Sequence, residues 1–294
     1  MQQEINNENH FVVDLLTTLR EEKFSPAGWW RFLAHSWNMS RKTANEHPTL
    51  KRSWLIVSGI ISMLAVIMLV ACFAFEGSGT ALRLLPGFLF CVVWQQSDLY
   101  WHLGLNRQAT TGRILPTIGV ANFFTWLRAL GASFLLGRLI GGISTPSWLA
   151  LSVFLCGVAT DILDGQVARR TSTQSKLGQI GDGEADFCLY LALTIILVQN
   201  TVLPLWIGLL MLLRFLIPLV AALGSYFLFA RTVHFGSTSL GKYAGLAQCL
   251  YFLVLLAPTQ LAFISHYLTL PLLIATIILL IAAPMAQIIA NVRA

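Results

Sequence analysis

The feature that most constrains this chain is a succession of apolar stretches, each long enough to cross a lipid bilayer. A transmembrane α-helix needs about 20 predominantly apolar residues, and eight stretches come near that length. They occupy approximately residues 54–75, 84–103, 117–140, 146–167, 184–200, 202–229, 243–261 and 268–290. The pattern predicts an all-α, polytopic integral membrane protein.

The composition supports this prediction. Hydrophobic residues make up 56% of the 294 residues and charged residues only 11%, against roughly 25% in soluble domains. The formal net charge of +6 lies mainly beside the apolar stretches, where cations suit anionic lipid headgroups and the control of topology. We therefore expect no nucleic-acid partner. The five cysteines show no metal-ligand spacing, so we expect neither a zinc site nor a disulfide framework.

The predicted spans divide the chain into three parts. Residues 1–53 form an amphipathic helical region, residues 54–110 add two transmembrane helices, and residues 111–294 hold six more. Ser25 and Pro26 are typical of an N-cap and first helical turn. The tryptophan-rich helix that follows either lies in the membrane interface or forms a small packed cap.

The loops predict the orientation. Lys and Arg are concentrated before the first span and in alternate loops, so the positive-inside rule places both termini and the segment 161–186 on the cytoplasmic side. We expect a multi-pass protein of a bacterial inner (cytoplasmic) membrane with a site that faces the cytoplasm.

All carboxylates after Asp98 lie in one short segment. If the neighbouring spans are helical, the first two acids share a face at the end of one helix, and two later acids share a face at the start of the next. Acids at membrane depth are by default candidates for function, and a loop that merely caps two helices does not explain this helical phase. The acids are Asp161, Asp164, Asp182, Glu184 and Asp186.

Four converging carboxylates favour hard divalent cations such as Mg²⁺ or Mn²⁺, and two such ions can share bridging carboxylates. Gly165, Ala168 and Gly178 remove side-chain bulk beside the acids, and Arg169 could contact a phosphate. This combination suits phosphoryl transfer on a pyrophosphate.

The segment DILDGQVARR followed by LGQIGDGEAD resembles the signature DxxDGxxARx8GxxxDxxxD of the CDP-alcohol phosphotransferase family. Every fixed position is matched, and the six-span region resembles the six-helix membrane domain of that family. The matching residues are Asp161, Asp164, Gly165, Ala168, Arg169, Gly178, Asp182 and Asp186.

The resemblance implies transfer of a substituted phosphate from a CDP-linked donor to an alcohol hydroxyl, with release of CMP. It implies that Asp161, Asp164, Asp182 and Asp186 bind two divalent ions and that Asp186 is also the general base. Gly165, Ala168, Arg169 and Gly178 would border the CDP group. It also suggests a homodimer.

Two further sets of polar residues are candidates for the site. One set resembles an NxxTxxR stretch of the family and consists of Asn122, Thr125 and Arg128. Asn122 and Thr125 would line the nucleotide site, or else form hydrogen bonds between helices. Arg128 would hold the acceptor or a phosphate, or else pair with a backbone carbonyl. Arg214 is an isolated intramembrane cation, which would hold an anionic headgroup or phosphate, or else pair with an acid.

The substrate stays open at this stage. We favour CDP-diacylglycerol with a small polar acceptor, because of Arg214 and the basic loops. The loop RRTSTQSKLG also resembles the branch that uses CDP-choline or CDP-ethanolamine with diacylglycerol. An ion-coupled transporter is the alternative of another class, but it does not explain the glycines and arginine at these spacings.

Overall fold

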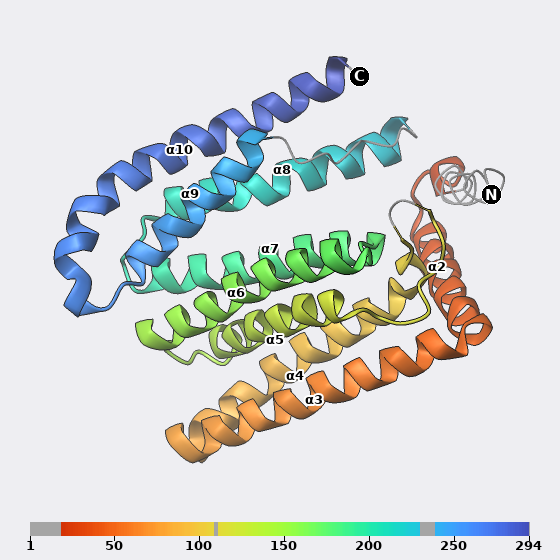
Figure 1. Cartoon of the computed structure of the whole chain (residues 1–294), viewed down its shortest axis with the longest axis horizontal. Coiled ribbons are helices and arrows are strands. Elements are labelled where there is room, and N and C mark those ends of the chain that lie inside the picture. Colours follow the sequence, from red (N-terminus) through yellow and green to blue (C-terminus); the bar gives the residue numbers. More distant parts are fainter. Residues whose placement is uncertain (1–18, 109–110, 230–238, 294) are drawn as a thin grey trace. The chain divides into compact units, whose positions relative to one another are not determined.

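The computed structural model describes residues 19–108, 111–229 and 239–293, and these residues are almost entirely α-helical (Figure 1). This confirms the predicted all-α fold. Of the amphipathic helical region expected over residues 1–53, residues 1–18 lie outside the described residues. The helices are α2 (Pro26–Glu46), α3 (Pro48–Glu76), α4 (Ser78–Trp101), α5 (Val120–Ile140), α6 (Ser147–Thr171), α7 (Lys176–Gln199), α8 (Leu205–Phe229), α9 (Ser239–Leu255) and α10 (Ala262–Arg293).

The helix starts follow local sequence signals. Ser25 Oγ accepts a hydrogen bond of 3.1 Å from the amide of Gly28, and Pro26 opens α2, so the predicted cap is confirmed. Pro48 occupies the first turn of α3, where its missing N–H costs nothing. Ser175 caps α7, because its Oγ accepts a bond of 3.0 Å from the amide of Gly178.

The chain divides into two compact units, residues 30–193 and residues 1–29 with 194–294. The first unit holds most of α2, all of α3 to α6, and α7 as far as Leu193. In this unit α3 packs on α4, α4 on α5 and α5 on α6, so that neighbours in sequence lie side by side (Figure 1). Its core includes the fully buried side chains of Leu84, Leu130, Leu135 and Phe154.

Two glycines let α4 and α5 approach closely. A Cβ atom at Gly137 would lie 2.7–2.8 Å from atoms of Phe88, and one at Gly87 would lie 2.7 Å from Ile140 Cβ. Such distances are too short for ordinary carbon contacts. The helix α4, which precedes the predicted six-helix domain, is therefore packed tightly against its first helix.

The connector between α4 and α5 joins several elements. Asn106 is buried, and its carbonyl accepts a bond of 2.8 Å from the amide of Leu115. The carbonyl of Arg107 accepts a bond of 3.1 Å from the amide of Lys176, at the start of α7. The amide of Ile118 donates to Ser53 Oγ over 2.9 Å. The connector thereby fixes the start of α5 and of α7, which both contribute to the site described below.

In the second unit, α9 packs along α10, and α8 also contacts α10. Met211 of α8 and Ala244, Tyr251 and Phe252 of α9 are buried. The three helices form a small helical core of their own.

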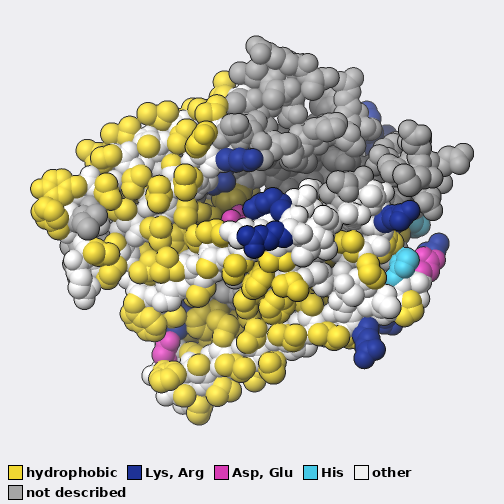
Figure 2. Space-filling view, in the orientation of Figure 1, with side chains coloured by type: hydrophobic (Ala, Val, Ile, Leu, Met, Phe, Trp, Pro, Cys, Tyr) yellow, Lys and Arg dark blue, Asp and Glu magenta, His cyan; other side chains and the backbone are white. Residues whose placement is uncertain are grey.

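Among the described residues, four segments are long and apolar enough to cross a membrane: Pro48–Glu76, Val120–Ile140, Ser147–Thr171 and Ser265–Met285. Hydrophobic side chains cover much of the left and lower parts of the described surface in Figure 2, as expected where lipid replaces water. The protein is therefore a multi-pass membrane protein. Helices α8 and α9 contain shorter apolar stretches, Leu205–Ile217 and Leu240–Leu255. The total of eight spans and the three-part division stay predictions.

Candidate active site

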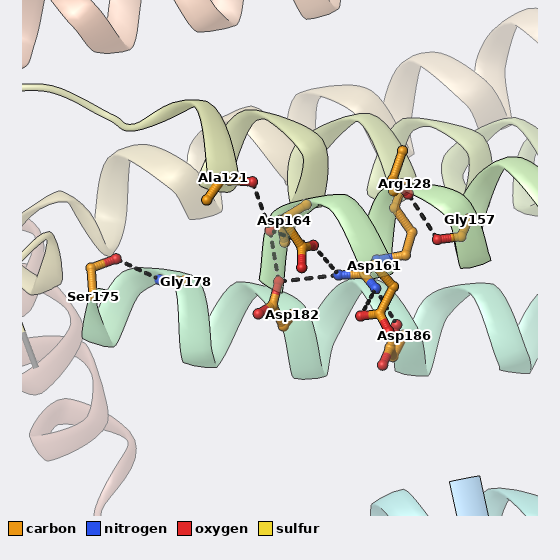
Figure 3. A network of polar contacts seen from close by, with 11 residues as sticks. Ala121, Arg128, Gly157, Asp161, Asp164, Ser175, Gly178, Asp182 and Asp186 are labelled. Carbon is orange, nitrogen blue, oxygen red and sulfur yellow. Dashed lines mark hydrogen bonds and ion pairs between the residues drawn. The ribbon is translucent and has the colours of Figure 1, made fainter. Parts of the chain in front are cut away.

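The helices α6 and α7 bring the four signature aspartates together. Asp161 and Asp164 lie near the end of α6, whereas Asp182 and Asp186 lie in the first half of α7. Figure 3 shows the four carboxylates in the space between these two helices, with Asp164 beside Asp182 and Asp161 beside Asp186. The helical phase of the sequence thus produces two facing pairs of acids.

Arg128 of α5 lies at the centre of the four acids. Its Nη2 lies 3.1 Å from Asp164 Oδ2 and 3.1 Å from Asp182 Oδ1. Its Nη1 lies 2.9 Å from Asp186 Oδ1 and also pairs with Asp161. One guanidinium therefore contacts all four carboxylates (Figure 3), an arrangement that neither predicted role of Arg128 includes.

Burial differs sharply within this group. The Arg128 side chain is 1% exposed and that of Asp164 is 6% exposed, whereas Asp161, Asp182 and Asp186 are 34–54% exposed. The guanidinium of Arg128 is buried between the helices, whereas three of the carboxylates remain accessible from outside the helix bundle. A ligand or ion can therefore reach the acids without opening the core.

The charges of the group do not balance. When all four aspartates are ionised, the single guanidinium leaves three negative charges uncompensated, and like charges this close repel strongly. The donor set consists of carboxylate oxygens that already converge on a cation, which is the chemistry that Mg²⁺ or Mn²⁺ requires. The residues therefore fit the two divalent ions that the sequence predicts.

Thr125 and Asn122 extend the site along α5. Thr125 Oγ1 donates to Asp182 Oδ1 over 2.6 Å, and it is 3.4 Å from Asp164 Oδ2. One turn earlier, Asn122 Nδ2 lies 3.3 Å from Ser175 Oγ. The predicted face of α5 thus bonds to α7, with Thr125 orienting an acid and Asn122 reaching the helix cap.

The small residues of the signature have different surroundings. A Cβ atom at Gly178 would lie 2.7 Å from Asn122 Oδ1, so this glycine makes room for the α5 side chain. The guanidinium of Arg169 lies over Gly165, with Nη1 3.1 Å from the position of an added Cβ. Ala168 is half-buried on the same helix. The end of the Arg169 side chain thus occupies the space beside Gly165.

Arg214 belongs to the second unit. Its Nη1 donates to Gln248 Oε1 over 3.1 Å, and its guanidinium lies 5.1 Å from the ring centre of Phe215. A Cβ at Gly245 would lie 2.6 Å from Arg214 Nη2, so α9 carries a glycine where this arginine packs. Its predicted role toward a headgroup or phosphate stays a prediction.

A second polar cluster was not predicted from the sequence. Asp98 and His102, at the end of α4, lie with Glu184 of α7 so that one ligand atom of each falls within 4.8 Å of the others. His102 Nδ1 is 3.1 Å from Asp98 Oδ1. These ligand types suit a divalent metal. The available signal was the four-residue spacing of Asp98 and His102.

Comparison with known proteins assigns the fold and site to a family. The model of the CDP-alcohol phosphatidyltransferase family matches residues 118–286, more than half of the chain. The chain therefore belongs to the CDP-alcohol phosphatidyltransferase family, a class of membrane transferases.

One relative is the "Cardiolipin synthase (CMP-forming)" of Streptomyces coelicolor, which is 33% identical over 113 residues. The aligned part covers 37% of this chain and 51% of the relative, so the chain spans about half the length of the curated relative it matches. No solved structure matches the chain.

Proposed function

We propose that this protein transfers a substituted phosphate from a CDP-linked donor to an alcohol hydroxyl and releases CMP. The observation that carries the proposal is the convergence of four carboxylates from α6 and α7 on one guanidinium. The family match supports a CDP-alcohol chemistry at these helices. In the reaction the acceptor oxygen forms a new bond to the phosphorus that carries the lipid or alcohol. The bond between that phosphorus and the bridging oxygen breaks, and the bridging oxygen leaves with CMP.

Members of the family use divalent metal ions, and in this chain Asp161, Asp164, Asp182 and Asp186 would hold two of them. Bound Mg²⁺ or Mn²⁺ would neutralise the pyrophosphate and the charge that develops on CMP. The facing pairs Asp164 with Asp182 and Asp161 with Asp186 supply carboxylates for two positions.

Asp186 would take the proton of the acceptor hydroxyl. Its side chain is 34% exposed and therefore within reach of an acceptor, unlike the buried Asp164. Its contact with Arg128 Nη1, over 2.9 Å, fixes the orientation of the carboxylate. General base catalysis by a positioned carboxylate typically contributes about 10²–10⁴-fold.

The nucleotide would lie toward the start of α7. Asn122 and Thr125 line this side through their bonds to Ser175 and Asp182. Arg169, whose guanidinium lies over Gly165, would contact a phosphate oxygen of the donor. Arg214 is the proposed contact for the acceptor or for its phosphate, and the buried Arg128 would act on them through the four carboxylates that it orients.

We favour CDP-diacylglycerol as the donor. The name of the relative specifies a lipid product and CMP, and an apolar helical surface suits a donor whose diacyl part stays in the membrane. Cardiolipin is accordingly one candidate product. A phospholipid formed from a small polar alcohol is the other. Transfer from CDP-choline or CDP-ethanolamine to diacylglycerol is the alternative within the same chemistry.

The experiment that tests this proposal is product identification. Purified protein in lipid nanodiscs is incubated with Mg²⁺ or Mn²⁺ and either CDP-diacylglycerol plus a panel of alcohols or CDP-choline plus diacylglycerol. Mass spectrometry then identifies the lipid formed. We expect a new phospholipid only with CDP-diacylglycerol. A product only with CDP-choline would reverse the choice of donor, and consumption of neither nucleotide would reject the reaction.

A further inference from the structure

A groove of about 780 Å³ lies between α2, α3 and α4, in the unit of residues 30–193. These helices precede residues 118–286, which the family model matches. The described residues that line the groove come from these three helices alone, whereas the four acids lie on α6 and α7. The groove is thus a feature separate from the candidate active site.

One end of the groove is basic and aromatic. Arg41 of α2 and Lys51 of α3 line it there, together with Trp37, Trp54 and Tyr100. Tyr100 packs edge-on against Trp54, with ring centres 4.9 Å apart. Arg41 and Lys51 are exposed and make no ion pair with any acid in the described part of the chain. Cations beside tryptophan and tyrosine are typical of the lipid headgroup level of membrane proteins, where such a combination suits an anion.

The rest of the groove is an apolar trough. It continues along α3 through Ala65 to Leu69 and along α4 back to Leu85. From Lys51 to Leu69 an α-helix rises about 27 Å at 1.5 Å per residue, which exceeds the half-thickness of about 15 Å of a bilayer hydrocarbon core. The trough is therefore long enough for an acyl chain that descends from a headgroup at the basic end.

Some polar atoms beside the basic end have no hydrogen-bond partner among the described residues. Trp54 Nε1 and both amide atoms of Gln96 are buried without a hydrogen bond to any described residue, and both side chains line the groove. Buried polar groups are rarely left in this state. An indole N–H and an amide at the junction of a basic end and an apolar trough match the ester carbonyls that join a phosphate to acyl chains.

We propose that this groove binds one anionic glycerophospholipid. The phosphate contacts Arg41 and Lys51, the ester carbonyls accept hydrogen bonds from Trp54 Nε1 and Gln96 Nε2, and an acyl chain fills the trough toward Leu69. A free phosphate uses only the basic end, and a zwitterionic lipid brings a choline cation to Arg41 and Lys51. The site therefore selects a lipid that is both acylated and anionic, and it does so independently of the proposed transfer reaction.

The headgroup contact is tested by lipid binding to full-length protein, measured by native mass spectrometry. The probes are phosphatidylglycerol and phosphatidylcholine with identical acyl chains. The test variant is R41Q/K51Q, and the matched control is K42Q/R52Q, which removes the same charge from the adjacent exposed positions outside the groove. We expect the preference for phosphatidylglycerol to fall about tenfold in R41Q/K51Q alone, from the loss of two cations near the headgroup. An equal fall in both variants, or no preference in the unmodified protein, overturns the proposal.

The acyl contact is tested by filling the trough. Ser62 lines the groove and is exposed, and the neighbouring exposed Met63 does not line it. Ser62→Trp should reduce the retention of phosphatidylglycerol severalfold, whereas Met63→Trp should leave it unchanged. Glycerol 3-phosphate serves as the competitor without acyl chains and should not displace the lipid. Effective displacement, or equal retention in the two tryptophan variants, would show that the trough is not part of the site.

Discussion

Arg128 lies among the four acids of the candidate active site and also compensates part of their negative charge. A guanidinium that is 1% exposed and contacts four carboxylates compensates a repulsion that would otherwise separate α6 from α7. Divalent ions bound by the same acids would provide this compensation as well. The contribution of Arg128 to the stability of the protein should therefore be smaller when divalent ions are bound.

Arg128→Gln should lower the stability of the metal-free protein. Removal of one partner from a buried ion pair costs about 3–5 kcal/mol, and here four acids lose their cation. We expect a fall of several degrees in the unfolding temperature in the presence of a chelator, most of it recovered with Mg²⁺, as followed by intrinsic fluorescence.

Arg138→Gln is the matched control. Arg138 is equally buried, but it pairs over 2.6 Å with Glu76 and donates to the carbonyl of Ser144, away from the four acids. Its loss should destabilise the protein by the same amount with and without Mg²⁺. If Mg²⁺ rescues both variants alike, the effect does not arise at the acid cluster.

At the residue level, the sequence predicted which acids matter but not what they contact. The spacing of Asn122, Thr125 and Arg128 indicated a shared helix face. It did not show that this face meets α7, because the pairing of helices depends on packing between distant segments. Glu184 lies in the acidic segment but outside the signature, and its place beside Asp98 and His102 depends on the position of α4.

The element that orders the site is α7, through its contact with α5. Gly178 leaves the space that Asn122 Oδ1 occupies, 2.7 Å from an added Cβ. The cap at Ser175 and the bond from Lys176 to Arg107 hold the same end of the helix. This end then directs Asp182 toward Thr125.

Gly178→Ala should disturb that contact. The added methyl forces Asn122 or α7 to move, at a cost of about 1–3 kcal/mol for overpacking, and a shift of Asp182 should lower the rate of CMP release. Gly183→Ala lies in the same helix with open space around it, so the gain in helix propensity of about 1 kcal/mol should leave it at least as stable. Thermal unfolding and CMP release in both variants provide the check. Equal behaviour of the two alanines would contradict the assigned contact.

At the level of elements, each of the eight predicted spans overlaps one of the described helices, because long apolar runs and caps are local signals. Their lengths were less predictable. Both α4 and α7 carry acids and amides inside their apolar runs. Some of these polar groups find partners in the core, as Gln95 Nε2 does with the carbonyl of Trp126 over 2.6 Å. The groove along α2 to α4 was not foreseen either, since it arises from three helices that no motif links.

For the whole molecule, the distribution of Lys and Arg predicts a cytoplasmic location for both ends of the described chain and for the acids. A fluorescent protein fused to the C-terminus should therefore be fluorescent, and alkaline phosphatase fused there should be inactive, when the protein is produced in a bacterial inner membrane. Active phosphatase at this position would reverse the orientation and place the acids on the other side.

The central claim is that the four acids perform metal-dependent transfer from a CDP-linked donor. The most direct test is the rate of CMP release from CDP-diacylglycerol in Asp186→Asn and Glu184→Gln, with Mg²⁺, Mn²⁺ or a chelator. The acid at 184 lies two residues from the signature position and faces α4, so the second variant makes the same chemical change outside the proposed site. We predict that the rate of CMP release falls about 10²–10⁴-fold in Asp186→Asn and stays near normal in Glu184→Gln. With the chelator we predict no CMP release. Normal release in Asp186→Asn, or release without divalent ions, would contradict the claim.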